Sequence, residues 1–347
     1  MPTFRDVMTA YKAASTYVHE TPIITSNALR QRSEHEEVVL KCENLQRTGC
    51  YNFRGVMNHI IRSKQVDIGI NHFVTQSVSN HGLAVALAAN EFASTGHIVI
   101  PANTPDIVVK SIKHYGGKVY PCCPSQDERM RIAQELVEAN NNSGKNGVNS
   151  CVYVHPQDDW LIAGNGTAGV ELMLQTDGRL DAVLVPAVGG TLLAGVAIAV
   201  KGMKPNIAVF AAECDKPDQM YEFEYGTVVA PGDNNNNNSS SSNVKVPGAR
   251  APYVRNLASE LSTPLSPHVA QCVNRHVDGV LKVTEAQTRQ AFRFIYERCK
   301  LVIDANAATA VAALITRPEA LKRYRRIGII LTGGNVELDE VPQLARL

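Results

Sequence analysis

The chain has 347 residues, of which 44% are hydrophobic and 19% charged, and its formal net charge at pH 7 is +1. A chain of this length buries a large core and is expected to form about two domains. The near-zero net charge excludes a global electrostatic attraction to nucleic acid or to an acidic membrane. No run approaches the roughly 20 apolar residues that a membrane-spanning helix needs.

The N-terminus and the cysteines predict a cytoplasmic protein. The first residues, MPTFRDVMTAYKAAS, contain Asp6 and alternate polar with apolar side chains, unlike a signal peptide. The eight cysteines form no CxxC pair and no zinc-binding spacing with histidine. Because a chain with this many core residues does not need disulfides, we expect reduced thiols in the cytosol.

In chain order, short β-branched runs alternate with amphipathic stretches. Strands are predicted at 37–43, 72–77, 97–102, 118–123, 151–156, 182–189, 208–214, 279–285 and 326–334. Helices are predicted at 55–65, 81–94, 105–115, 126–141, 163–175, 191–202, 285–299 and 305–316. Short apolar strands separated by helices indicate an α/β fold with parallel sheets covered on both faces. Ligands of such folds bind at the carboxyl ends of the strands.

One segment interrupts this alternation. Residues 231–250, PGDNNNNNSSSSNVKVPGAR, are polar, low in complexity and bounded by proline and glycine. This composition predicts a flexible surface insertion rather than packed structure.

The first candidate binding turn is SVSNHGLAVALAA at 77–89, where a strand ends and a helix begins. The free N–H groups and the dipole of a helix N-terminus attract anions, and Ser77, Ser79, Asn80 and Gly82 suit the approach of a carboxylate or phenolate. Serine and asparagine caps are common, however, so this turn by itself is a weak signal.

Two further turns follow the same pattern. In VPAVGGTLLAG, 185–195, the residues Gly189, Gly190 and Thr191 suit one phosphate, although neither a Walker loop nor a dinucleotide fingerprint is present. In ILTGGNVEL, 330–338, Thr332 points a hydroxyl over the end of the sheet. A tight turn without a ligand explains either motif equally well when it is considered alone.

Together with TGCYNFRGV at 48–56, these turns resemble a known family. The chain resembles the fold-type II pyridoxal-phosphate enzymes, close to the serine racemase and serine/threonine dehydratase group. The matching motifs, in the family's order and over nearly the whole chain, are KCENLQRTGCYNFRG, SNHG, YGGKV, IAGNGTAGVE, GGTLLAG, AAE and TGGNV. The resemblance implies two parallel-sheet α/β domains with the cofactor in the cleft between them. The large domain is then expected at 1–46 and 148–347, and the small inserted domain at 47–147.

The resemblance also exposes a missing reactive group. The family motif is approximately T-G-S-F-K-x-R-G, and its lysine forms a Schiff base with pyridoxal phosphate. Asn52 occupies that position, with Cys50 and Tyr51 in place of the serine and phenylalanine. An amide nitrogen forms no Schiff base and cannot shuttle the substrate's α-proton. We do not expect the nearest other lysines, Lys41 and Lys64, to take over this role.

Other family positions have changed as well. Val78 stands where the family's second acid/base serine for racemisation is implied. The phosphate cradle of four glycines corresponds to Val188, Gly189, Gly190 and Thr191. Because a branched Val188 disfavours positive φ angles, the resemblance implies weaker phosphate binding. Several positions changed together, which favours natural divergence over a single engineered substitution at Asn52.

The remaining matches imply binding roles. Asn80 matches the residue that hydrogen-bonds the phenolic oxygen of the cofactor, and Thr332 matches the hydroxyl that faces its pyridine nitrogen. Ser77, Asn80 and His81 match the substrate carboxylate site. The family's divalent-cation site, for Mg or Ca, is implied at Glu213. Its later acid corresponds to Gln219, a poorer ligand for a hard cation.

Two functions therefore stay open. By resemblance, the protein is a pyridoxal-phosphate-dependent serine racemase or serine/threonine dehydratase whose catalysis Asn52 impairs. The alternative is a non-catalytic relative that binds pyridoxal phosphate or an amino acid non-covalently, or that acts as a subunit partner. Because family members are commonly dimers, a homodimer or a heterodimer with an active relative is expected. New chemistry in the old cleft has no replacement constellation in the sequence to support it.

Overall fold

A computed structural model describes residues 1–77, 80–123, 125–143, 150–215 and 265–346, and its strands and helices alternate as predicted. The strands are β1 (Ile23–Thr25), β2 (Glu37–Cys42), β3 (Ile70–Gln76), β4 (Thr95–Pro101), β5 (Lys118–Cys122), β6 (Ser150–Tyr153), β7 (Ala182–Pro186), β8 (Ala208–Cys214), β9 (Gly279–Val283) and β10 (Arg326–Leu331). The predicted insertion at 231–250 lies outside the described residues.

Helices separate most of the strands, and several were not predicted because they are short or lie outside the strand–helix alternation. The helices that matter for the site are α3 (Asn52–Val66), α4 (Asn80–Glu91), α5 (Asp106–His114), α6 (Gln126–Ser143), α7 (Asp159–Asn165), α8 (Thr167–Gln175), α9 (Thr191–Met203) and α13 (Ala305–Thr316). The others are α1 (Phe4–Ala14), α2 (Asn27–Ser33), η1 (Glu43–Leu45), α11 (Pro267–His276), α12 (Glu285–Phe294), η4 (Ile295–Cys299), α14 (Pro318–Leu321) and α15 (Val341–Leu344).

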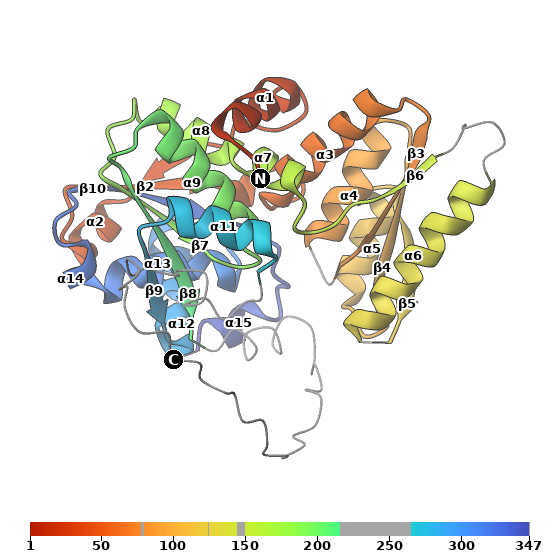
Figure 1. Ribbon diagram of the computed structural model, residues 1–347. Coiled ribbons are helices and arrows are strands. Elements are labelled where there is room, and N and C mark those ends of the chain that lie inside the picture. Colours follow the sequence, from red (N-terminus) through yellow and green to blue (C-terminus); the bar gives the residue numbers. More distant parts are fainter. Residues whose placement is uncertain (78–79, 124, 144–149, 216–264, 347) are drawn as a thin grey trace, which may run out of the picture.

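The described strands form two sheets, which lie in two lobes of the molecule (Figure 1). The larger sheet has the order β1-β2-β10-β7-β8-β9, and the smaller has the order β5-β4-β3-β6. Every neighbouring pair is parallel except β1 with β2. The predicted α/β fold with two parallel sheets is confirmed, and the antiparallel edge strand β1 is too short to have left a hydrophobic pattern.

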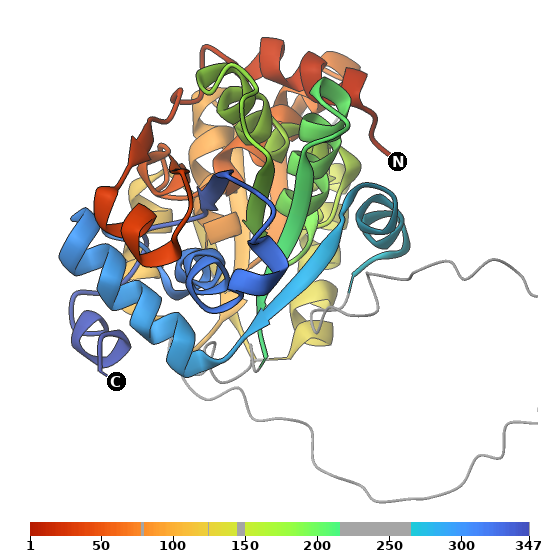
Figure 2. The ribbon, with the colours of Figure 1, turned by 90° about the vertical axis from the view of Figure 1, so that its left-hand side faces the viewer.

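Helices cover both faces of the larger sheet, as its sequence requires. Its central strands β7 and β8 are buried along their whole length, which explains their continuous apolar runs. Helices α12 and α13 pack on one face, and α8, α9 and α11 on the other (Figure 2). Because side chains alternate along a strand, β2 directs Leu40 to the α13 side and Val39 to the α9 side. Lys41 lies two residues after Val39, so its side chain is on the same face of the sheet, toward α8.

Helix α3 connects the two lobes. Its apolar residues pack against α4 of the smaller lobe and against α7, which leads into the larger lobe. The contact with α7 is close because two glycines meet there: a Cβ on Gly164 would lie 2.7 Å from Cα of Gly55. The start of α3, with Asn52, is therefore held at the boundary of the lobes. Within the described residues, no helix is long and apolar enough to cross a membrane.

Candidate active site

Asn52 begins α3 directly beside the end of β10. The N–H of Tyr51 donates to the carbonyl of Thr332 over 3.1 Å, and the N–H of Gly334 donates to the carbonyl of Gly49 over 2.9 Å. The two motifs TGCYN and LTGGN, far apart in the chain, thus meet at one place. This meeting point is the carboxyl end of β10, where ligands of α/β proteins bind.

The Asn52 side chain forms a hydrogen bond with the neighbouring thiol. Sγ of Cys50 donates to Oδ1 of Asn52 over 2.9 Å. Burial raises the pKa of the Cys50 thiol well above its ordinary value, and the nearby Asp304 carboxylate raises it further. The thiol is therefore protonated at neutral pH and serves as a donor, not as a nucleophile. Where the family has the amine of a lysine, this chain has the amide of Asn52 beside the neutral thiol of Cys50.

Asp304 completes the wall behind this pair, and the sequence analysis missed it. It is the N-cap of α13, where its Oδ1 accepts from the N–H of Ala307 at 2.8 Å. Burial raises the pKa of its carboxyl to about 6. A Cβ on Gly333 would collide with Oδ2 of Asp304 and would lie 3.3 Å from Sγ of Cys50. Glycine at 333 is thus required for the side chains of Asp304 and Cys50 to approach each other. The only sequence signal for Asp304 was its place as a cap before an alanine-rich helix.

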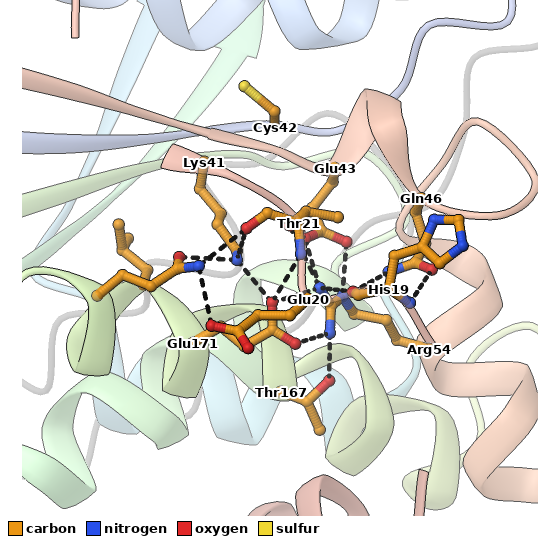
Figure 3. Close-up of polar contacts among 12 residues, drawn as sticks. His19, Glu20, Thr21, Lys41, Cys42, Glu43, Gln46, Arg54, Thr167 and Glu171 are labelled. Atoms are coloured by element: carbon orange, nitrogen blue, oxygen red, sulfur yellow. Dashed lines mark hydrogen bonds and ion pairs between the residues drawn. The ribbon is translucent and has the colours of Figure 1, made fainter. Parts of the chain in front are cut away.

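Lys41 cannot replace the missing lysine because all its donors are used. Its Nζ donates to Oε2 of Glu171 at 2.6 Å, to the carbonyl of Thr21 at 2.7 Å and to Oε1 of Gln175 at 2.9 Å (Figure 3). An ammonium has three N–H donors, so none is left for a ligand. Burial lowers the pKa of Lys41, while the neighbouring carboxylates oppose that shift.

Lys41 belongs to a buried charge cluster of two cations and two carboxylates: Lys41, Glu43, Arg54 and Glu171. Arg54 is fully buried and donates from Nε to Glu43 and from Nη1 to Glu171, each over 2.6 Å. Burial alone would raise the pKa of Glu43, but the Arg54 guanidinium holds it below its ordinary value. Equal numbers of opposite charges satisfy one another, which makes the cluster structural. It ties β2, α3 and α8 together.

Lys64 is also engaged, far along α3 from Asn52. Its Nζ donates to Oδ1 of Asn71 over 2.9 Å, at the beginning of β3. The expectation that neither lysine takes over the role of the missing one therefore agrees with their geometry.

The turn between β3 and α4 contains most of the predicted carboxylate site. Ser77 is buried and its Oγ accepts from the N–H of Gly82 at 2.9 Å. Asn80 is the first residue of α4, and its Oδ1 accepts from Nδ2 of Asn335 at 2.8 Å. Val78 and Ser79 lie outside the described residues. Asn335 thereby joins this turn to the segment after β10.

Arg129 supplies positive charge near this turn, whereas His81 does not. Nε2 of His81 lies 3.4 Å from the carbonyl of Val154, and burial lowers the pKa of His81 to about 4, so the ring is neutral at pH 7. Arg129 on α6 is half-buried, and its Nε donates to Oε1 of Gln76 at the end of β3 over 3.3 Å. Within the described part of the chain, Arg129 forms no ion pair. A single arginine in a polar helix carries no motif, which is why the sequence analysis missed it.

Among the described residues, nothing covers the turn between β7 and α9 at Gly189, where a phosphate would lie. Gly189 and Gly190 have positive φ angles of 67° and 74°, whereas half-buried Val188 does not. The backbone conflict expected at Val188 therefore does not arise. A Cβ on Gly189 would meet no atom of the described residues within 4 Å, so its outer side is free of them. Thr191 begins α9, whose N-terminal N–H groups and dipole favour an anion.

Several buried polar atoms near these turns have no hydrogen-bond partner in the described structure. They include Oγ1 of Thr48, Oγ1 of Thr332 and Oδ1 of Asn165. Asn165 lies against Gly55 of α3, and its Nδ2 donates to Oγ1 of Thr191 over 3.2 Å. It therefore links the start of α3 to the phosphate turn. Unsatisfied buried polar atoms are rare in native proteins and often indicate a missing ligand or water.

Within the described ranges, no further metal-binding side chain joins Glu213 in a cluster. Glu213 is buried in β8, with Nζ of Lys282 at 3.8 Å from its Oε2. Gln219 lies outside the described residues. In the described ranges, no group of three or more His, Cys, Asp or Glu side chains could hold a metal ion. Mg or Ca at Glu213 stays a prediction.

A family model described as pyridoxal-phosphate dependent enzyme matches residues 14–333. The chain belongs to this family. The serine racemase of Dictyostelium discoideum is 31% identical over 344 residues, which make up 99% of this chain and 97% of that protein. The β-hydroxyaspartate dehydratase of Paracoccus denitrificans is 29% identical over 346 residues, or 99% of each chain.

Solved structures of family members share the fold. The crystal structure of the Dictyostelium discoideum serine racemase has a TM-score of 0.78 and covers 97% of this chain and 99% of its own. The crystal structure of a threonine deaminase from T.th. is 28% identical, with a TM-score of 0.76 and coverage of 97% and 99%. The fold is thus the fold-type II architecture of pyridoxal-phosphate-dependent enzymes.

The residues at this site suit the pyridine nitrogen and the phosphate of pyridoxal phosphate, but not its aldehyde. The unpartnered Thr332 hydroxyl fits a pyridine nitrogen, and the open turn at Gly189 fits a phosphate. The aldehyde, however, requires a free amine to become attached. Asn52 offers an amide that accepts the Cys50 thiol, and Lys41 and Lys64 are hydrogen-bonded elsewhere. Covalent attachment therefore does not fit this site.

Proposed function

We propose that this protein binds pyridoxal phosphate without a covalent bond and neither racemises nor dehydrates amino acids. The observation that carries the proposal is the pair of Asn52 and Cys50 at the start of α3. Neither side chain is a nucleophile or a base at neutral pH, and the family's chemistry begins with an amine at this position.

The pyridine nitrogen and the phosphate of the cofactor would find suitable partners at this site, whereas its aldehyde would not. The hydroxyl of Thr332 has no partner in the described structure and can donate to the pyridine nitrogen. The turn at Gly189 and Gly190 offers backbone N–H groups and the N-terminus of α9 to the phosphate. When bound, the group would act here as a ligand and not as a reagent.

A small carboxylate ligand would bind beside it, at the end of β3. Arg129 forms no ion pair within the described residues, and it lies where Gln76 ends the strand. A cation of this kind attracts the carboxylate of an amino acid. The proposal therefore includes an amino acid as second ligand, held by the β3–α4 turn and Arg129.

The activities of the relatives define the reactions to test. They include serine racemase, β-hydroxyaspartate dehydratase and threonine deaminase. We extend the proposal to a cytoplasmic location, which the eight free cysteines support. A homodimer, or a heterodimer with an active relative, stays part of the proposal.

The test is an absorption spectrum of the purified protein with added pyridoxal phosphate, followed by borohydride reduction and peptide mass mapping. We expect no visible imine band and no reduced adduct on any lysine, together with saturable binding by calorimetry. Assays with L-serine, L-threonine and β-hydroxyaspartate should release neither ammonia nor a D-amino acid.

Asn52→Lys is the positive control for labelling, and Asn52→Gln is the matched variant without an amine. Labelling of the Asn52→Lys peptide alone supports the proposal. A reduced adduct on a lysine of the unmodified protein, with turnover of any of the three substrates, overturns it.

A further inference from the structure

Hydrogen-bond acceptors lie around the position at which the family has its reactive amine. Oδ1 of Asn52 accepts from the Cys50 thiol over 2.9 Å. The carboxylate of Asp304 approaches the same thiol, because a Cβ on Gly333 would lie 3.3 Å from Sγ of Cys50 and would collide with Oδ2 of Asp304. An amide oxygen and a carboxylate, both acceptors, therefore meet at this thiol.

The Asp304 carboxylate is buried and has no cationic partner among the described residues. Asp304 is 2% exposed, and burial raises the pKa of its carboxyl to about 6, so the group is largely ionised at neutral pH. Its Oδ1 accepts from the N–H of Ala307, but no lysine, arginine or histidine of the described ranges forms an ion pair with it. Glu43, the other carboxylate near the Cys50 thiol, is paired with Arg54. Because a buried charge is costly without a partner, this site favours a ligand that carries a positive charge.

Two forms of the cofactor differ in charge at the atom that the family's lysine would reach. Pyridoxal phosphate has a neutral aldehyde there, whose oxygen only accepts hydrogen bonds. Pyridoxamine phosphate has an aminomethyl group, which is an ammonium at neutral pH and has three N–H donors. The Asn52 amide can donate to an aldehyde, but a hydrogen bond between neutral groups is about half as strong as one from a charged donor. Thr332 and the turn at Gly189 suit the pyridine nitrogen and the phosphate of either form.

We propose that the candidate active site binds pyridoxamine phosphate in preference to pyridoxal phosphate, with the ammonium donating to Oδ1 of Asn52 near the unpaired carboxylate of Asp304. Because the phosphate and the pyridine nitrogen keep the partners named above, this preference rests on the proposed function. The ligand itself then supplies the nitrogen that the family takes from its lysine. The carbon that bears this nitrogen has no carbonyl group for another amine to attack.

The test is calorimetric titration of the full chain, freed of cofactor, with pyridoxamine phosphate, pyridoxine phosphate and pyridoxal phosphate. Pyridoxine phosphate is the matched control ligand, because its alcohol has the size of the amine without the charge. We expect pyridoxamine phosphate to bind about tenfold more tightly than pyridoxine phosphate, which corresponds to the difference between a charged and a neutral hydrogen bond. Equal affinities of all three ligands overturn this proposal and leave the proposed function intact. Absence of binding by all three overturns both.

Asp304→Asn tests the role of the buried charge. Asparagine removes the charge and is a good N-cap for α13, so the helix keeps its start. The preference for pyridoxamine phosphate over pyridoxine phosphate should disappear, while the affinity for pyridoxine phosphate stays the same. Asp181→Asn is the matched control, because Asp181 pairs with Arg326 at the start of β7, the end of the larger sheet away from the site. The control should keep the preference, and an Asp304→Asn variant that also keeps it overturns the proposal.

Two substitutions at Asn52 test the acceptor without a change at Asp304. Asn52→Asp adds a negative charge at the start of α3, where the helix dipole also favours one, and should raise the preference for pyridoxamine phosphate by about three- to tenfold. Asn52→Leu removes the amide oxygen and should lower the preference by a similar factor. Thermal unfolding checks that each variant keeps its fold. The same preference in both variants overturns the proposal.

Discussion

The thiol of Cys50 donates a hydrogen bond to Oδ1 of Asn52 across 2.9 Å, at the first residue of α3. Two of the three residues at which TGCYN departs from the family motif therefore contact each other. The buried Asp304 carboxylate lies on the other side of the thiol, over Gly333. The site is organised around an amide, a neutral thiol and a carboxyl group, and this arrangement has no group that could serve as the missing amine.

Asn52→Lys should restore covalent binding of pyridoxal phosphate but little turnover. The side chain at 52 is half-buried at a helix start, so the longer lysine can be accommodated. Val78 still stands where the second acid/base serine is implied, so that group remains absent. Borohydride labelling should rise from none to near one per chain, while serine and threonine turnover stays close to background. Substantial turnover would show that the lysine was the only defect.

Thr332→Val should weaken pyridoxal phosphate binding without destabilising the free protein. The Thr332 hydroxyl is buried and has no partner in the described structure, so its removal costs no hydrogen bond before the ligand binds. One lost hydrogen bond corresponds to an affinity reduced by about three- to tenfold. Calorimetric titration gives the affinity and thermal unfolding gives the stability. Thr332→Ser keeps the hydroxyl and should keep the affinity.

Removal of a cation from the buried charge cluster should be strongly destabilising. Arg54→Met leaves both Glu43 and Glu171 without their main partner and should cost about 3–5 kcal/mol of unfolding free energy. Lys41→Met should cost less, because Glu171 keeps its bond to Arg54. Arg325→Met removes an exposed pair with Glu36 and should cost less than about 1 kcal/mol. Urea unfolding measures all three, and equal losses would contradict the cluster's role.

Stability should fall in mild acid, partly through His97. Nε2 of His97 lies 3.0 Å from Nδ1 of His72, and its Nδ1 lies 2.8 Å from the Tyr120 hydroxyl. Burial, with His72 and Lys118 nearby, lowers the pKa of His97 to about 4. The unfolded chain takes up this proton near pH 6.5 and the native protein only near pH 4. The contribution of His97 to the free energy of unfolding is therefore complete above pH 6.5. It is lost as the pH falls from 6.5 to 4, by up to about 1.4 kcal/mol per pH unit.

His97→Gln should accordingly show a shallower loss of stability between pH 6.5 and 4.5. His114→Gln, at an exposed ring, is the matched control and should keep the slope of the unmodified protein. Denaturant unfolding at several pH values measures the slopes. Identical slopes for the two variants would exclude His97 as a contributor.

Much of the larger scaffold was predictable because its signals are local. The apolar run at 182–189 predicted β7, which is buried on both faces, and the glycine pair after it predicted the turn into α9. The replacement of the family's lysine by Asn52 is likewise visible in the sequence alone. By contrast, β1 has only three residues, and only Gly166 separates α7 from α8, so neither leaves a separate periodic pattern.

The sequence alone determined the α/β fold, the three glycine-containing turns and the absence of an amine at Asn52, since each depends on residue type and short spacing. Only the tertiary structure decided that Lys41 is locked by Glu171, a partner 130 residues away, and that Asp304 stands behind Cys50. The contact between Asn80 and Asn335 also required it, because these residues lie in the β3–α4 turn and in the segment after β10. Contacts between distant segments depend on how whole elements pack, and no local pattern records them.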